Sequence, residues 1–136
     1  MRIFHLSDLH IGLKLINRDL REDQEYILDQ IIQKAAEKVP DAIVIAGDIY
    51  DKAVPSAEAV EVFDHFIGKL RNAVSDSVIM MISGNHDSAP RVNCFRSVLD
   101  RQKIYMIGMP PQTEADQIAQ VTLEDTCGPV HFYLLP

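Results

Sequence analysis

The sequence predicts an α/β fold in which helices are layered on a parallel sheet. Short apolar runs suited to strands buried on both faces alternate with stretches of helical periodicity, and this alternation is typical of β-α-β units. The clearest run, residues 43–46, is followed by Gly47 and Asp48, so a carboxylate emerges where the strand ends. Because ligands of open α/β sheets bind beyond the carboxyl ends of the strands, we expect a functional site there.

The first part of the chain forms one such unit. Residues 2–7 are predicted to form the first strand, and a polar loop over residues 12–19 leads into a helix that Pro40 ends. Acidic residues near the start of this helix and lysines near its end match the helix dipole. The crossover to the strand at 43–46 is expected to be right-handed. Three side chains of the polar loop either contact phosphate or are simply solvated: Lys14, Asn17 and Arg18.

The alternation continues and then changes. The Pro-Ser pair at 55–56 opens a second helix, and residues 78–83 form a third strand. Residues 104–108 read as a fourth buried strand. Residues 118–124 and 130–135 have no helix between them and predict a hairpin that starts a second sheet. Between the third and fourth strands a third helix is expected, with four apolar residues on one face: Val92, Phe95, Val98 and Leu99.

Composition and charge exclude several classes of protein. With 47% apolar and 24% charged residues, the chain is typical of a globular domain. It has no apolar run near the ~20 residues of a membrane span and no signal-peptide pattern, so we expect a cytoplasmic protein that does not associate with membranes. The net charge of −7 argues against nucleic-acid binding by a broad basic surface, although two bound divalent ions would offset four of these charges. Cys94 and Cys127 lack C-x-x-C spacing and are expected to be reduced thiols.

Polar motifs follow three of the predicted strands. They are Asp8-x-His10, Gly47-Asp48-x-x-Asp51 and Gly84-Asn85-His86-Asp87. In extended backbone, residues two positions apart point the same way, so the side chains of Asp8 and His10 are presented together. A mixed set of carboxylate, imidazole and amide ligands suits Mn, Fe or Zn better than Ca or Mg. The three motifs together predict a metal centre.

These motifs, in this order, resemble the signature of the calcineurin-like metallophosphoesterases. The resemblance covers residues 1 to about 108, and within the superfamily the residues around the motifs are similar to those of the SbcD nuclease subunits. It implies a layered αββα sandwich and a metal-dependent nuclease that cleaves phosphodiester bonds at DNA ends in repair and recombination. It also implies an ATPase partner of the SbcC type, with long coiled coils. The similar segments are Ser7 to Gly12, Asn17 to Glu25, Gly47 to Asp51 with Pro55 and Ser56, and Ser83 to Ser88 with Arg91.

The resemblance assigns metal-binding roles to four of these residues. Asp8 and His10 would hold one divalent ion, Asp48 would bridge two, and Asn85 would hold the second. Mn is the expected metal, with Fe and Zn as alternatives. Such a pair of ions activates water and neutralises charge on the phosphate.

Two further residues are implied to act in catalysis. His86 would contact the phosphate oxygens or protonate the leaving group, and Asp51 would orient His86. A helix or turn cap is the alternative interpretation of Asp51, and the same alternative is stronger for Asp87. His65, on a helix surface, and His131, inside an apolar strand, are expected to have no role in the site.

The chain departs from the family in one respect. Related proteins supply further histidines from a Gly-His and a Gly-His-x-His motif downstream, and neither is found in this sequence. Fewer imidazole ligands weaken metal binding. We therefore expect residues 1–136 to be the N-terminal portion of a metallophosphoesterase domain, truncated before the second sheet is complete, with an incomplete site, weak metal binding and little turnover.

Two alternatives remain open from the sequence. The first is another activity of the same superfamily, a phosphatase or cyclic-nucleotide phosphodiesterase, because the three motifs serve the phosphate and not the leaving group. The second is a short non-catalytic module that binds a partner or dimerises through the second and third helices. Core packing on the sheet explains the same apolar residues without a partner: Phe63, Phe66, Phe95 and Leu99.

Overall fold

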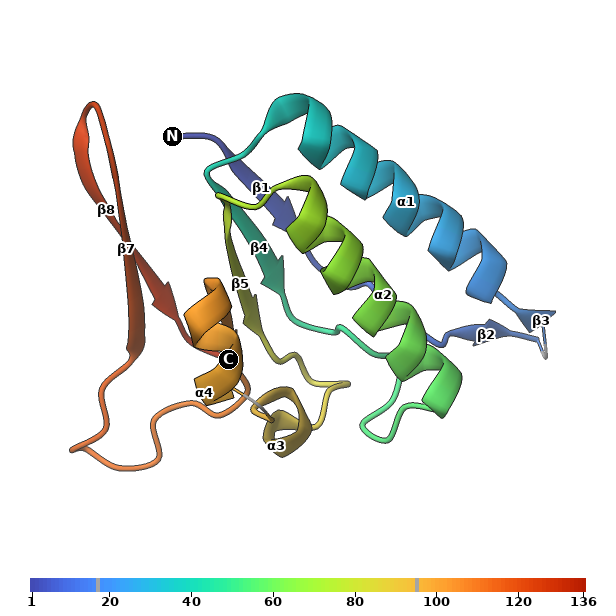
Figure 1. Ribbon diagram of the computed structural model, residues 1–136. Helices are drawn as coiled ribbons and strands as arrows, with labels where there is room; N and C mark the ends of the chain where they lie inside the picture. Colours follow the sequence, from blue (N-terminus) through green and yellow to red (C-terminus); the bar gives the residue numbers. More distant parts are fainter. Residues whose placement is uncertain (17, 95) are drawn as a thin grey trace.

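The centre of the molecule is a four-stranded parallel sheet (Figure 1). The computed structural model describes residues 1–16, 18–94 and 96–136. The order of the strands across the sheet is β1-β4-β5-β6, and each neighbouring pair is parallel. The predicted α/β fold with a parallel sheet is thereby confirmed. The strands are β1 (Ile3–Leu6), β4 (Ala42–Ala46), β5 (Val78–Ile82) and β6 (Ile104–Ile107).

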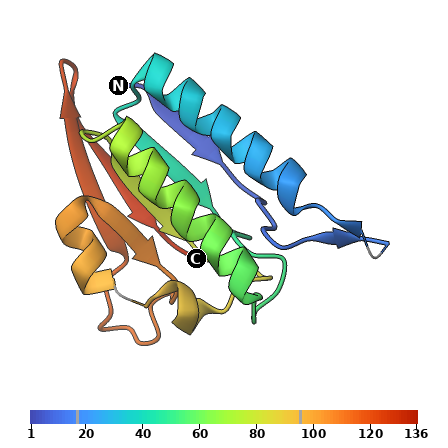
Figure 2. The ribbon, with the colours of Figure 1, turned by 45° about the vertical axis from the view of Figure 1, so that its right-hand side comes forward.

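Two long helices, α1 (Arg21–Lys38) and α2 (Ala57–Ala73), cover one face of this sheet (Figures 1 and 2). Helix α1 ends at Val39, which adopts a left-handed conformation immediately before Pro40. Helix α2 begins at the N-cap Ser56, whose hydroxyl accepts a hydrogen bond from the backbone N–H of Ala59 at 3.3 Å. Both helices form where the sequence predicts them. The apolar face of α2 packs into the core through Ala59, Val62, Phe63, Phe66 and Leu70.

Phe63 and Phe66 are core residues, 7% and 2% exposed, so packing on the sheet explains both. Leu99 is half-buried against the same core. Phe95, the remaining member of that group, lies outside the described residues, as does Asn17 of the polar loop.

The prediction of one continuous third helix is wrong. The segment forms two single turns, α3 (Ala89–Val92) and α4 (Arg96–Leu99), followed by the 3-10 turn η1 (Asp100–Gln102). The first turn ends at Asn93, whose side-chain oxygen accepts a hydrogen bond from the N–H of Gly108 at 3.3 Å. This contact joins the end of the first turn to the residue that follows β6. Val92 is buried, whereas Val98 is 60% exposed.

The predicted C-terminal hairpin is present and forms a second layer. Strands β7 (Ala119–Asp125) and β8 (Gly128–Leu134) pair antiparallel, from Ala119 opposite Leu134 to Asp125 opposite Gly128. Their inner face packs on the side of the parallel sheet away from α1 and α2 (Figure 1). The second core contains residues of both sheets: Ala42, Val78, Met80, Ile107, Val121 and Leu134.

The polar loop contains structure that the sequence did not predict. Strands β2 (Lys14–Leu15) and β3 (Arg18–Asp19) form a short antiparallel ribbon that projects beside the start of α1. The Lys14 ammonium lies 3.5 Å from the carboxylate of Asp19, at the base of the ribbon.

No helix in the described part of the chain has both the length and the apolar character that crossing a membrane requires.

Candidate metal centre

The three motif-bearing loops meet at the carboxyl edge of the parallel sheet. The loops after β1 and β4 continue to pair beyond the strands themselves: Asp8 N–H donates to Gly47 O at 3.2 Å and His10 N–H donates to Asp48 O at 3.0 Å. The pairing extends to Ile11, whose N–H donates to Ile49 O at 2.9 Å. This prolonged ladder holds the Asp8 and His10 backbone beside that of Asp48.

Three of the candidate ligands have a strained backbone. The φ values of Asp8, His10 and Asp48 are 56°, 44° and 48°. They fall in the left-handed region, which residues other than glycine adopt only uncommonly. Such conformations cost roughly 1–3 kcal/mol each and cluster at functional sites. Three other described non-glycine residues also have positive φ, at the tip of the β2–β3 ribbon and just after two helical segments: Ile16, Val39 and Lys103. Asp and His adopt this region more readily than most residues, and the clustering of three such positions at one sheet edge is typical of a functional site.

The spacing of the donor atoms fits a shared cation. His10 Nε2 lies 4.0 Å from Asp8 Oδ1 and 3.9 Å from Asp48 Oδ2, which is too long for a hydrogen bond. Two atoms that each coordinate one ion at ~2.1 Å lie at most ~4.2 Å apart, so these separations match a common metal. His10, Asp48 and His86 each offer a ligand atom within 4.8 Å of the others, which is slightly wider than the spacing on one shared ion. The residues present thus fit a divalent metal through carboxylate oxygen and imidazole nitrogen.

The other nitrogen of His10 faces Asp51. His10 Nδ1 is buried and has no hydrogen-bond partner among the described residues, and the nearest carboxylate atom, Asp51 Oδ1, is 3.8 Å away. The ring of His86 meets the ring of His10 edge to face, with centroids 4.8 Å apart. A metal-bound histidine usually gives its second N–H to a carboxylate or carbonyl, and Asp51 lies nearest to that nitrogen of His10 but beyond hydrogen-bond distance.

His86 is held by two contacts to the loop after β4. Its backbone N–H donates to Asp48 Oδ1 at 2.9 Å, and its ring Nδ1 lies 2.9 Å from the carbonyl oxygen of Asp51. Because a carbonyl only accepts, Nδ1 carries the proton and Nε2 is left for a ligand or a phosphate. This carbonyl, with smaller effects of the carboxylates of Asp48, Asp51 and Asp87, raises the pKa of His86 despite partial desolvation. Asp51 therefore contacts His86 through its backbone carbonyl, whereas the resemblance implied that the acid itself orients His86, and that role stays a prediction.

The predicted site residues differ in exposure. Asp48 is buried, the side chain of Asp8 is 67% exposed, and His86 is exposed. Asn85 is exposed on the loop after β5, next to His86. The structure thus gathers Asp8, His10, Asp48 and His86 with Asp51 beside them, while the part that Asn85 plays as a ligand stays a prediction.

The loops after β4 and β5 are locked together by two carboxylates. Besides the Asp48 contact to His86, Asp87 accepts the N–H groups of Ile49 at 3.0 Å, Tyr50 at 2.9 Å and Gly84 at 2.9 Å. Gly84 permits this close approach, since a Cβ at this position would lie 2.1 Å from Asp48 Oδ1. Asp87, for which a turn cap was the stronger interpretation from sequence, caps its own turn and braces the neighbouring loop as well.

One residue that contacts the site loops is missing from the motifs. Gln24, in the first turns of α1, makes hydrogen bonds to the loop that carries His10. Two sequence signals point to it: Gln24 falls in the similar segment from Asn17 to Glu25, and it lies one helical turn before the buried Leu28 and hence on the same face of the helix. A polar residue at such a position is a candidate for a contact with a neighbouring loop.

The fold and the site together define a metal-dependent hydrolase whose ligands come from the loops at the carboxyl edge of a parallel sheet. The comparison with known families agrees with this class. The family model of the calcineurin-like phosphoesterases matches residues 1–131. The chain belongs to the calcineurin-like phosphoesterase family.

Proposed function

We propose that this protein is a nuclease subunit that hydrolyses phosphodiester bonds at DNA ends. The observation that carries the proposal is the convergence of Asp8, His10, Asp48 and His86 at one sheet edge, with three of these residues in the left-handed region. The similarity of the residues around the motifs to SbcD nuclease subunits supports DNA as the substrate. Family membership alone supports the coarser statement, a metal-dependent hydrolase.

The residues of the chain have separable parts in this proposal. Asp8, His10 and Asp48 would hold divalent metal, with Mn proposed first, and Asn85 would complete a second position. Such ions, when bound, supply a nucleophile from water and neutralise the charge that develops on the phosphate.

His86 keeps its Nδ1 proton against the Asp51 carbonyl and presents Nε2 outward. Its raised pKa favours the protonated ring, which binds a phosphate oxygen or gives a proton to the leaving oxygen.

The net charge of −7 repels the phosphates of DNA, so DNA binding needs an additional source of positive charge. We propose that bound metal and an ATPase partner of the SbcC type supply the positive charge that attracts the phosphates. We propose a cytoplasmic location. We also propose that two copies of the chain form a dimer through α2 and the α3–α4 segment.

A single-turnover assay with the purified chain in excess over substrate tests this function, because we expect slow turnover. The substrates are linear duplex DNA, a closed circle of the same sequence, bis-p-nitrophenyl phosphate and p-nitrophenyl phosphate, each with Mn²⁺ and with EDTA. We expect Mn²⁺-dependent cleavage of the linear duplex first, and loss of cleavage in Asp48→Asn.

Faster hydrolysis of the phosphomonoester would instead indicate a phosphatase. Preference for the small diester over DNA would indicate a phosphodiesterase of the cyclic-nucleotide class. Cleavage that persists unchanged in Asp48→Asn would contradict the assignment of the site.

A further inference from the structure

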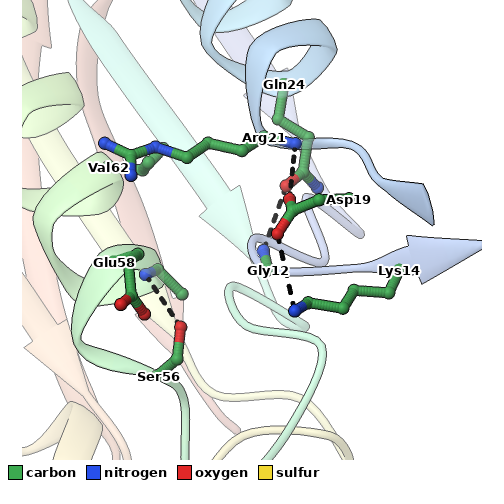
Figure 3. Close-up of a pocket in the computed structure, with 9 residues that line it drawn as sticks. Gly12, Lys14, Asp19, Arg21, Gln24, Ser56, Glu58 and Val62 are labelled. Carbon is green, nitrogen blue, oxygen red and sulfur yellow. Dashed lines mark hydrogen bonds and ion pairs between the residues drawn. The ribbon is translucent and has the colours of Figure 1, made fainter. Parts of the chain in front are cut away.

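The side chain of Gln24 joins helix α1 to the loop that carries Asp8 and His10. Its Oε1 accepts the N–H of Gly12 at 3.0 Å, and its Nε2 donates to the carbonyl of His10 at 2.8 Å and to that of Leu9 at 3.3 Å. Figure 3 shows the amide of Gln24 directed toward Gly12. One half-buried side chain thus satisfies three backbone groups within four consecutive residues.

The contacts of Gln24 lie on a stretch of backbone that the loop after β4 holds from the other side. The N–H groups of His10 and Ile11 donate to that loop, and the carbonyl of His10 also accepts the N–H of Leu13 at 3.0 Å. Gln24 adds an acceptor for Gly12 and a donor for the carbonyls of Leu9 and His10. A residue in the left-handed region, as His10 is with φ of 44°, persists only where its surroundings fix it from several directions.

Gln24 lies between two hollows. It lines a cavity of about 270 Å³ beside Gly12 and Lys14, and also an apolar groove of about 460 Å³ beside Asp8 and Leu9. From this position its amide supplies an acceptor to the N–H of Gly12 and a donor to the carbonyls of Leu9 and His10.

We propose that Gln24 is a positioning residue for the metal centre: it fixes residues 8–12 in the conformation that presents Asp8 and His10 to a divalent cation. This inference rests on the proposed function only in taking these two residues as metal ligands. Removing a partner that is hydrogen-bonded to a ligand side chain typically changes metal affinity by about 10- to 100-fold, and we expect an effect of that order from a partner of the ligand-bearing backbone.

A Mn²⁺ titration followed by electron paramagnetic resonance tests the effect on the metal. Gln24→Glu has nearly the same shape and keeps the acceptor for Gly12, but it directs a carboxylate at two carbonyl oxygens. Gln30→Glu is the matched control, because it makes the same chemical change at an exposed position of the same helix. We expect Gln24→Glu to bind Mn²⁺ at least tenfold more weakly and Gln30→Glu to bind as wild type. The added negative charge would by itself strengthen binding, so a loss cannot be a charge effect.

A second readout needs no metal and separates this inference from the proposed function. Hydrogen exchange of the Gly12 amide, measured by NMR in the metal-free protein, is expected to be at least tenfold faster in Gln24→Ala and unchanged in Gln30→Ala. If wild type binds no Mn²⁺, the metal-dependent function fails while faster exchange at Gly12 still supports the positioning of the loop. Unchanged exchange in Gln24→Ala, or unchanged Mn²⁺ affinity in Gln24→Glu beside a binding wild type, would overturn the inference.

Discussion

Replacing Asp87 should destabilise the whole protein, although its side chain lies in a loop. Asp87 Oδ2 accepts the N–H groups of Ile49 and Gly84, and Oδ1 accepts that of Tyr50. In Asp87→Ala all three donors lose their acceptor, and at about 1 kcal/mol each the expected loss is about 3 kcal/mol. Asp87→Asn can turn its amide so that the oxygen keeps the two donors at the Oδ2 position, which leaves one donor unpaired and an expected loss of about 1–2 kcal/mol.

Urea unfolding followed by circular dichroism measures these differences, provided that the m-values stay equal. Asp64→Ala is the matched control, because Asp64 is an exposed acid on α2. A loss of about 3 kcal/mol would be a large share of the 5–15 kcal/mol typical of a domain. The reasoning is refuted if Asp87→Ala lies within about 0.5 kcal/mol of wild type. It is also refuted if the Asn and Ala variants lose equal stability, since the loss would then not follow the number of unpaired donors.

Two further predictions concern the site loops. Gly84→Ala should abolish Mn²⁺ binding, because its Cβ would lie 2.1 Å from Asp48 Oδ1 and 2.4 Å from Asp48 N, whereas Gly68→Ala, with nothing within 4 Å, should bind as wild type in the same titration. Binding by Gly84→Ala would show that the two loops can separate without loss of the site. Burial, followed by the nearby carboxylates, raises the pKa of Tyr50 from its ordinary 10.0 to about 12. Folding therefore favours the neutral phenol, and this contribution to stability is complete below pH 10 and is lost as the pH rises toward 12. The ultraviolet difference titration of wild type minus Tyr50→Phe should have its midpoint near the raised value in the folded protein and near 10 in urea; equal midpoints would contradict the burial.

Strands, helices and motifs could be predicted from the sequence where the pattern of neighbouring residues determines them. The strand at 42–46 is a continuous apolar run, and the following Gly47-Asp48 places a carboxylate at its end, so both strand and candidate ligand follow from neighbouring residues. The break in the third helix could not be predicted in this way. At the break Asn93 contacts Gly108, 15 positions away, and a contact between such distant positions leaves no trace in the helical periodicity.

The supporting contacts of the site were hidden from sequence for a similar reason. Asp87 and Gln24 act on backbone N–H and carbonyl groups, which every residue has and which leave no pattern in the side chains they contact. The left-handed conformations of Asp8 and His10 are likewise set by pairing with the loop after β4. The identity of the candidate ligands can be inferred from motifs, whereas their arrangement depends on contacts between distant loops.

The hydrogen-bond ladder that continues past β1 and β4 orders the site loop during folding, before any metal binds. Fixing the backbone of one residue costs roughly 1–2 kcal/mol in conformational entropy. Because the ladder runs from Asp8 to Ile11, these residues are already ordered when the chain folds. A cation therefore binds without a further loss of conformational entropy in this loop. Its affinity then depends on the number of ligands at the site. Metal binding should accordingly add to stability by mass action while leaving the shape of this edge unchanged.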